Sequence, residues 1–424
     1  MARHDLDGFG LRANADPALP AHLPRLRGLD HTFAVMRQGY GFISSHCNAL
    51  GTDGFRIRLM GQDTVCLRGP EAARLLYGAD GLTRRGAMPA TVLRLLQDKG
   101  SVHQLDGEEH RRRKGMFIRQ VMDPARVEAL VRGFEAAWQA QLRPNTEVTV
   151  LDLANTALAR AVCHWAGLYP SEARLRKLTG VLFAMSDRSG SVGPFMFATL
   201  WQRRGVERWL EREIAAVQAG AAAPEGSTLQ AFARDLPAKV AAVEMLNILR
   251  PVVAVGRYIA FAAKTLHEHP MWCGLFCSGN EDFIPDFCEE VRRISPFFPF
   301  TAAVAKRDLD WQGAKIAAGT RILFDIHGTN NDSRNFPLPA RFRPERMLDW
   351  QLDDPCFVPQ GAGDVATTHR CPGEAVTLAL MGSAVQMLCC RMKYDVPDQD
   401  MSIAMNRIPA QPASGVRIRI QRID

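Results

Sequence analysis

The fold of this chain is decided by one stretch, Phe357-Val-Pro-Gln-Gly-Ala-Gly-Asp-Val-Ala-Thr-Thr-His-Arg-Cys371-Pro-Gly-Glu374. A glycine-rich loop presents Cys371 after two basic residues and before Pro372, a residue that suits the first turn of a helix. The run 375–392 is apolar nearly all round, as in a buried helix. We therefore expect Cys371 at a helix N-terminus, where the helix dipole and the basic neighbours lower the pKa of its thiol.

A thiolate at this position can attack a substrate, enter a redox pair or bind a metal ion. The alternative is an inert structural thiol, because free cysteine is among the most buried residue types. The other nine cysteines are scattered, and Cys273/Cys277 and Cys389/Cys390 do not form the paired CxxC spacing of a zinc site. We expect neither a zinc site nor a disulfide framework, and we interpret most of these cysteines as core thiols.

The composition is that of a globular protein with a sizeable core. Hydrophobic residues make up 47% of the 424 residues and charged residues 23%. No apolar run is long enough for a membrane span, and the first residues carry acids in place of the apolar segment of a signal peptide, so we expect a cytoplasmic protein. The net charge is +7, but the longest basic run, at 111–114, is short and lies in a predicted helix, so we expect no nucleic-acid partner.

The order of predicted elements indicates a mainly α fold with small β-sheets towards the two ends of the chain. Residues 1–27 are rich in Pro, Ala and Arg and are predicted to be a partly disordered extension. Residues 54–69 alternate as a hairpin, and strands are expected at 302–308 and 315–325. Helices are expected at 29–36, 71–77, 108–122, 125–141, 153–168, 171–186, 197–219, 237–267, 281–295 and 375–392. Since no linker divides the chain, we predict one domain over 28–424.

Pro251 lies in the middle of the predicted helix 237–267, beside Arg250. A proline there removes a backbone hydrogen bond and kinks the helix. An arginine buried beside such a kink is costly unless it has a partner.

Three further motifs, taken together, resemble the cytochrome P-450 superfamily. Glu290 and Arg293 form an E-x-x-R pair, which alone would be read as a solvated surface pair. They are followed by Phe342-Arg-Pro-Glu-Arg346 and then by the cysteine loop. The resemblance implies the triangular helical haem-thiolate fold, a haem b whose iron is bound by Cys371, and a structural lock made by Glu290, Arg293 and Arg346. A thiolate ligand favours cleavage of the O–O bond.

The cysteine loop is longer than the superfamily pattern Phe-x-x-Gly-x-Arg-x-Cys, since Phe357 lies 14 residues ahead of Cys371. In this it is similar to the fatty-acid peroxygenase branch, whose other motifs match at 84–89, 106–110 and 250–251. The resemblance implies that hydrogen peroxide hydroxylates a long-chain fatty acid at Cα or Cβ, with some decarboxylation to terminal alkenes. No redox partner is then required.

The resemblance also implies roles for the residues of the substrate site. Arg250 would hold the carboxylate of the fatty acid, and that carboxylate would serve as the general acid–base, because 249–256 contains neither an acid nor a threonine. His103 would face the haem centre, where a histidine can donate a proton near neutral pH and where a polar cap on the pocket is the alternative. Pro251, Gln97 and Phe298 complete the expected substrate contacts, and Gln97 stands where many members of the branch have phenylalanine.

The haem propionates need basic partners. By position these are expected to be Arg84, His110, Lys114, His369 and Arg370, with His110 and Lys114 one helical turn apart on one face. Two other functions stay open: a monooxygenase that needs O₂ and a ferredoxin and reductase, and a haem- or fatty-acid-binding protein without catalysis. The sequence does not predict the oligomeric state.

Overall fold

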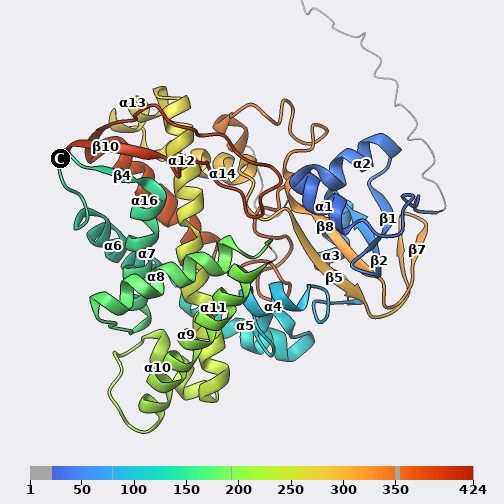
Figure 1. Ribbon diagram of the computed structural model, residues 1–424, viewed down its shortest axis with the longest axis horizontal. Coiled ribbons are helices and arrows are strands. Elements are labelled where there is room, and N and C mark those ends of the chain that lie inside the picture. Colours follow the sequence, from blue (N-terminus) through green and yellow to red (C-terminus); the bar gives the residue numbers. More distant parts are fainter. Residues whose placement is uncertain (1–21, 79, 192, 349–353, 424) are drawn as a thin grey trace, which may run out of the picture.

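The computed structural model of the chain describes residues 22–78, 80–191, 193–348 and 354–423. Helices fill one side of the molecule, and the largest sheet lies at the other side with α1 and α2 beside it (Figure 1). The expected mainly α fold with small sheets is confirmed. Within the described residues, no helix combines the length and the apolar character that a membrane crossing requires.

The helices before the midpoint of the chain are α1 (Thr32–Gln38), α2 (Phe42–Leu50), α3 (Pro70–Gly78), α4 (Ala90–Leu96), α5 (Gly107–Val121), α6 (Pro124–Gln139), α7 (Val150–Ala166), α8 (Glu172–Asp187) and α9 (Pro194–Gln218). They are followed by α10 (Thr228–Asp235), α11 (Ala238–Ala254), α12 (Gly256–Glu268), α13 (Met271–Cys277), α14 (Ile284–Ile294), α15 (Ile326–Asn330) and α16 (Glu374–Cys390). The short 3-10 helix η2 (Val102–Gln104) lies between α4 and α5.

The main sheet joins strands from both ends of the chain. Its order is β1 (Gly54–Leu59), β2 (Gln62–Leu67), β8 (Arg321–Asp325), β5 (Phe300–Ala305) and β3 (Leu82–Thr83). The predicted hairpin is β1–β2, and β2 runs parallel to β8 with Val65 opposite Ile322. A second sheet has the order β4 (Glu147–Thr149), β10 (Arg417–Ile423) and β9 (Met392–Asp395), and β6 (Leu309–Trp311) pairs with β7 (Ala314–Ile316).

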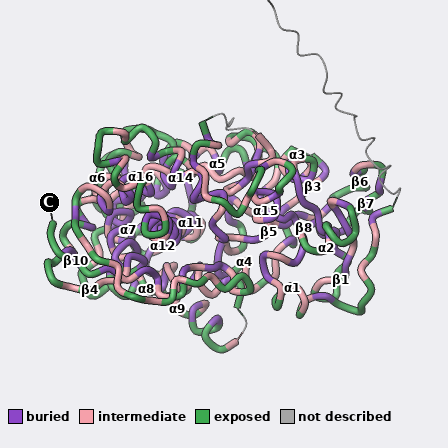
Figure 2. Tube along the Cα trace, turned by 90° about the horizontal axis from the view of Figure 1, so that it is seen from above, coloured by how far each residue is buried: buried purple, intermediate pink, exposed green. Residues whose placement is uncertain are grey.

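The main core lies where α7 packs against α6, α11 and α12. Nearly every residue of α12 from Gly256 to Leu266 is buried, and α7 and α11 are buried along most of their length, as the purple segments of Figure 2 show. Apolar residues on several sides of a helix are typical of a central position in the fold. α11 therefore forms a fixed support for the residues that it carries.

The helix predicted over 237–267 is two helices, and the break is not at the proline. Pro251 lies inside α11, which ends at Ala254, and α12 begins at Gly256. Val255 alone separates the two helices, and its backbone keeps helical angles (φ −58°, ψ −26°). Gly256 lies against α7, where a Cβ atom would come within 2.3 Å of Asn155 Oδ1, so a side chain at 256 would force α12 and α7 apart.

Two further expectations are corrected at the start of α16 and at the cysteines. α16 begins at Glu374 with Gly373 as its N-cap, so Pro372 precedes the helix and Cys371 lies in the loop.

Cys277 and Cys390 form a disulfide with a Cα–Cα distance of 5.5 Å, although we expected none. The spacing of the cysteines in the sequence could not show this pair, because it depends on α13 lying beside α16.

Part of the predicted N-terminal extension lies against the sheet. Residues 1–21 are outside the described residues. Leu23 is buried in the core beneath the main sheet, and the backbones of Pro24 and Leu26 form hydrogen bonds with Arg56 of β1.

Candidate active site

One cavity of about 360 Å³ lies between α11, the α4–α5 segment and the cysteine loop. Every predicted site residue lines it: Arg84, Gln97, His103, His110, Lys114, Arg250, Pro251, Phe298, His369, Arg370 and Cys371. These residues come from six separate parts of the chain, and the fold brings them to one place.

Cys371 is held in the loop by two hydrogen bonds with Gln360, one through its backbone N–H and one through its sulfur. Its N–H donates to the carbonyl of Gln360 at 3.0 Å, and the Nε2 of Gln360 lies 3.5 Å from Cys371 Sγ and 3.3 Å from Thr377 Oγ1. Burial raises the pKa of the Cys371 thiol, and a hydrogen bond from the Gly373 backbone opposes this rise. The expectation of a lowered pKa is therefore wrong for the protein alone, because burial outweighs the neighbouring donors. A thiolate here requires a metal cation, which deprotonates the thiol that binds it.

Arg250 is buried on α11 at the side of the cavity, and its Nε has no hydrogen-bond partner among the described residues. Burial, and then the charge of the nearby Arg203, lowers its pKa to about 9. The guanidinium is still positively charged at neutral pH. A buried cation without a bonded acid favours an anionic ligand in the cavity.

His103 lies on η2 and lines the same cavity, and its buried Nδ1 has no hydrogen-bond partner in the part of the chain that the structure describes. Burial lowers the pKa of its imidazole to about 3, and the positive charge of Arg250 acts in the same direction. The ring is thus neutral at neutral pH, which corrects the expectation that it gives up a proton in this range. A neutral imidazole can still donate one hydrogen bond and accept another.

The remaining basic residues form one group beside the cysteine loop. Lys114 Nζ donates to the carbonyls of Thr368 and Arg370, and the ring of His110 lies 4.1 Å from that of His369. Burial lowers the pKa of Lys114 to about 8, that of His110 to about 4 and that of His369 to about 2.

Two arginines in this group are already engaged with other protein atoms. Arg84 Nη1 donates to the Ala302 carbonyl at 2.7 Å and to Thr301 Oγ1 at 3.0 Å. Arg370 Nε donates to Glu374 Oε2 at 2.7 Å. His110 and Lys114 both line the cavity from α5, whereas Arg370 is directed to α16.

The cavity residues fit a haem. No Asp or Glu occurs among the described residues that line the cavity, although it is lined by three arginines, a lysine and three histidines. The cavity lining thus contains no negative charge that would offset the desolvation of these basic side chains. The two propionates of a haem and an iron-bound thiolate would supply that charge, with Cys371 as the iron ligand and Lys114, His110, His369 and Arg84 near the carboxylates.

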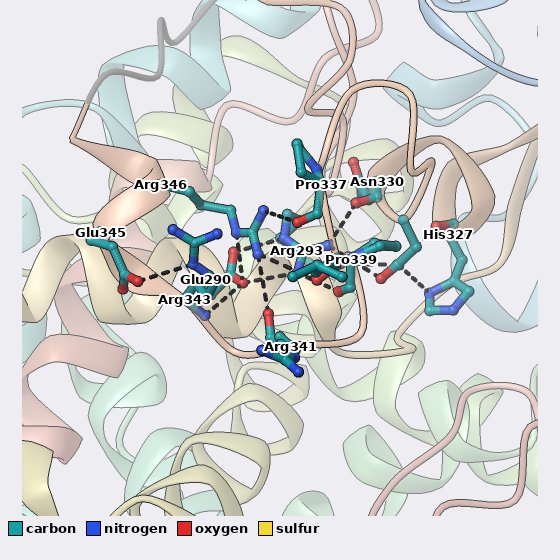
Figure 3. Close-up of polar contacts among 12 residues, drawn as sticks. Glu290, Arg293, His327, Asn330, Pro337, Pro339, Arg341, Arg343, Glu345 and Arg346 are labelled. Atoms are coloured by element: carbon teal, nitrogen blue, oxygen red, sulfur yellow. Dashed lines mark hydrogen bonds and ion pairs between the residues drawn. The ribbon is translucent and has the colours of Figure 1, made fainter.

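Behind the cysteine loop, the E-x-x-R pair is buried and not on the surface. Arg293 donates to both oxygens of Glu290, at 2.6 and 2.8 Å, and Arg346 Nε donates to Glu290 Oε1 at 3.1 Å. Arg293 also donates to the carbonyls of Asn330 and Pro339, and Figure 3 shows all these groups meeting between α14 and the 330–346 segment. Glu290 and Arg293 are fully buried, so the predicted lock among the three residues is present.

Two residues of the site have no place in the predicted set. Gln360, the only side chain that donates to Cys371 Sγ among the described residues, stands in the stretch that decides the fold. Glu244 accepts hydrogen bonds from the Val102 N–H at 2.8 Å, Arg113 Nη1 at 2.8 Å and Asn247 Nδ2 at 3.0 Å, and so fixes η2 against α11. The available signal was a single acid within the apolar run 240–249.

Comparison with known proteins places this geometry among haem-thiolate enzymes. The family model for cytochrome P-450 matches residues 282–410. A putative cytochrome P-450 of Mycobacterium tuberculosis is 30% identical over 144 residues, which are 34% of this chain and 29% of the relative. The beta-amyrin 28-monooxygenase of Kalopanax septemlobus is 27% identical over 131 residues, 31% of this chain and 26% of the relative. The chain thus spans less than a third of the length of these curated relatives.

Solved structures match nearly the whole chain. Cytochrome P450EX alpha, solved with myristic acid, is 34% identical with a TM-score of 0.90, and the match covers 94% of this chain and 98% of that one. A variant of cytochrome P450SP alpha is 38% identical with a TM-score of 0.89, and the match covers 93% of this chain and 100% of that one. A variant of cytochrome P450 OleT in complex with arachidonic acid is 31% identical over 94% and 97%, with a TM-score of 0.89.

Proposed function

The chain belongs to the cytochrome P-450 family, and we propose that it is a peroxygenase that uses hydrogen peroxide to hydroxylate long-chain fatty acids at Cα or Cβ, with some decarboxylation. One observation carries the proposal. Arg250 is a buried cation on the wall of the cavity that contains Cys371, and no acid among the described residues is bonded to it. The fatty acids bound in two of the similar structures support the same substrate class.

Arg250 would bind the substrate carboxylate through two parallel N–H···O bonds, which fix both its distance and its plane. A haem bound to Cys371 supplies the oxidising chemistry with peroxide. The carboxylate held by Arg250 would accept a proton from the peroxide and return it to the leaving oxygen, as a general acid–base does. This route replaces the acid and threonine of an oxygen-activating enzyme, since 249–256 contains neither.

The alkyl chain would lie along the apolar part of the cavity. Its lining there includes Leu96, Phe117, Val121, Ile248, Val252 and Phe298. Apolar walls with a few convergent polar groups are typical of sites that bind a lipid-like ligand in one orientation. Gln97 and Pro251 would contact the chain near its carboxyl end, and His103 would contribute a neutral hydrogen-bonding group opposite Arg250.

We propose one catalytic domain over 28–424, in which Lys114, His110, His369 and Arg84 hold the propionates. Arg370 would contribute mainly by orienting the loop, because its guanidinium is paired with Glu374. No redox partner and no nucleic acid enters this scheme.

The proposal is tested with purified holoprotein, a saturated C14–C18 acid and hydrogen peroxide, without NADPH or a reductase. We expect α- or β-hydroxy acid from the native protein and at least a hundredfold loss of turnover in Arg250→Ala. Arg250→Lys keeps the charge but loses the two-pronged geometry, so its activity should be intermediate. Haem content and the thiolate-type carbon monoxide spectrum should be unchanged in both variants.

The alternatives give different results. Product that appears only with a ferredoxin, a reductase and O₂ would identify a conventional monooxygenase. A spectral shift on fatty-acid binding without product under either condition would identify a binding protein. Full peroxide-driven activity in Arg250→Ala would contradict the carboxylate-assisted route.

A further inference from the structure

Four of the ten cysteines meet at one place that the proposed reaction does not use. Cys273 and Cys277 lie one helical turn apart on α13, and Cys389 and Cys390 are the last two residues of α16. Cys277 is bonded to Cys390, while Cys273 Sγ lies 2.7 Å from Cys389 Sγ. The short helix α13 and the end of α16 are thus joined by one disulfide and one adjacent pair of thiols.

The structure holds this thiol pair ready to react. Both Cys273 and Cys389 are partly accessible, and Cys277 is exposed, whereas Cys47, Cys66, Cys163 and Cys288 are buried. The hydrogen bond from Cys389 lowers the pKa of Cys273, and the same contact raises the pKa of the Cys389 thiol. A cysteine of lowered pKa beside a resolving thiol is the arrangement of peroxide-reactive cysteines.

We propose that Cys273 and Cys389 form a second peroxide-reactive site, independent of the haem, which closes to a disulfide beside the existing one. This inference rests on the proposed function for its supply of peroxide, because a peroxygenase works in the presence of hydrogen peroxide. The site would consume peroxide that is not used on substrate and would add a second covalent link between α13 and the end of α16.

The chemistry balances with hydrogen peroxide as the only oxidant. The Cys273 thiolate attacks one peroxide oxygen, the O–O bond breaks, and hydroxide leaves, which gives a sulfenic acid on Cys273. The Cys389 sulfur then attacks that sulfur, the S–O bond breaks, and a second hydroxide leaves as the S–S bond forms. The two thiol protons convert both hydroxides to water, so two thiols and one peroxide give one disulfide and two waters.

The site is tested by counting thiols in the holoprotein without fatty acid. Eight cysteines are free, so denatured protein should titrate eight thiols before peroxide treatment and six after it. Dithiothreitol reduces both disulfides, so all ten thiols should titrate after its use, in peroxide-treated and untreated protein alike. The count should stay constant in Cys273→Ser/Cys389→Ser, and the loss of two should persist in Cys163→Ser, which changes a buried thiol elsewhere in the core.

The link itself is mapped in the double variant Cys277→Ser/Cys390→Ser. Cleavage after Lys and Arg yields the peptides 265–292 and 371–391, which contain Cys273 and Cys389. We expect peroxide to join these peptides in the double variant and not when Cys273→Ser is added. Oxygen addition to Cys273 without a link, or eight thiols remaining after treatment, would overturn the proposal.

The test is separable from the proposed function. Arg250→Ala should form the link as readily as native protein although it no longer hydroxylates fatty acid. If native protein hydroxylates fatty acid with peroxide but forms no link, the thiol site fails alone. If the link forms but no fatty acid is oxidised, the proposed function fails alone.

Discussion

At the scale of single residues, burial has a larger effect on the ionisable groups of the cavity than their charged neighbours have. It is the largest cause of the pKa shifts of His103, Lys114, Arg250 and Cys371. Each shift favours the neutral form of its group, as desolvation requires. An anionic ligand in the cavity would offset part of this cost for Lys114 and Arg250, because a nearby opposite charge favours their charged forms.

The same principle predicts how the protein responds to acid. Burial, and then the charge of Arg293, lowers the pKa of His327 from 6.5 to about 4. As the pH falls below 6.5, the unfolded chain therefore binds this proton before the folded protein does. The free energy of unfolding decreases from there down to about pH 4, where the ring of the folded protein also becomes protonated. At about 1.4 kcal/mol per pKa unit, the loss from this residue is about 3 kcal/mol.

Urea unfolding between pH 8 and pH 4 checks this expectation. The free energy of unfolding should fall less steeply in His327→Gln than in the native protein. His22→Gln, which changes an exposed histidine, should follow the native curve. A curve for His327→Gln that matches the native one would show that the buried ring does not carry this acid sensitivity.

The identities of the cavity residues could be predicted from the sequence, but their charge states could not. The motifs around Cys371 and Arg250 predict which positions face the cavity, and the structure brings all of them there. The directions of the Cys371 and His103 shifts depend on how much protein surrounds each group, and that is a tertiary property. Gln360 and Glu244 act through contacts with single atoms that no spacing encodes.

At the scale of elements, α11 carries two buried charges of opposite sign, Glu244 and Arg250. Glu244 is satisfied by three donors and is paired with Arg113, whereas Arg250 faces the cavity. The first charge thus fastens the helix to its surroundings, and the second is left for a ligand.

Replacing Glu244 tests this fastening. Glu244→Gln leaves Arg113 buried without an opposite charge, and removing one partner of a buried ion pair costs about 3–5 kcal/mol. We expect a loss of this size in urea unfolding. Glu128→Gln breaks the exposed pair with Arg132 and should change stability by less than about 1 kcal/mol. Equal effects of the two variants would contradict the assigned role of Glu244.

The helices could be predicted by their apolar periodicity, but some of their ends could not. The helices at 108–122 and 125–141 correspond to α5 and α6 within a few residues. The break that divides the predicted helix 237–267 could not be predicted in this way. Gly256, just after the break, contacts Asn155 of α7, which is distant in the sequence, and such a contact depends on tertiary packing.

At the scale of the whole molecule, the start of the folded domain can be measured. Leu23 is 8% exposed and packs with the core beneath the main sheet, although it precedes the predicted boundary at 28. Leu23→Ala should cost about 2–5 kcal/mol in urea unfolding, as other large-to-small core changes do. Leu29 is 93% exposed, so Leu29→Ala should change stability by no more than about 0.5 kcal/mol. A negligible effect of Leu23→Ala would place residues 22–27 outside the domain.

The order of the main sheet has a consequence for synthesis on the ribosome. β2 is flanked by β1 and β8, and Gly69, just after β2, donates a hydrogen bond to Thr329, 260 residues later. At about 5–20 residues per second, the nascent hairpin waits on the order of ten to fifty seconds for that neighbour. Until then the edge of β2 is open to pairing with other chains. Crowded expression should therefore favour aggregation of the early half of the chain, and ample chaperone that covers the open edge during the wait should raise the yield of folded protein.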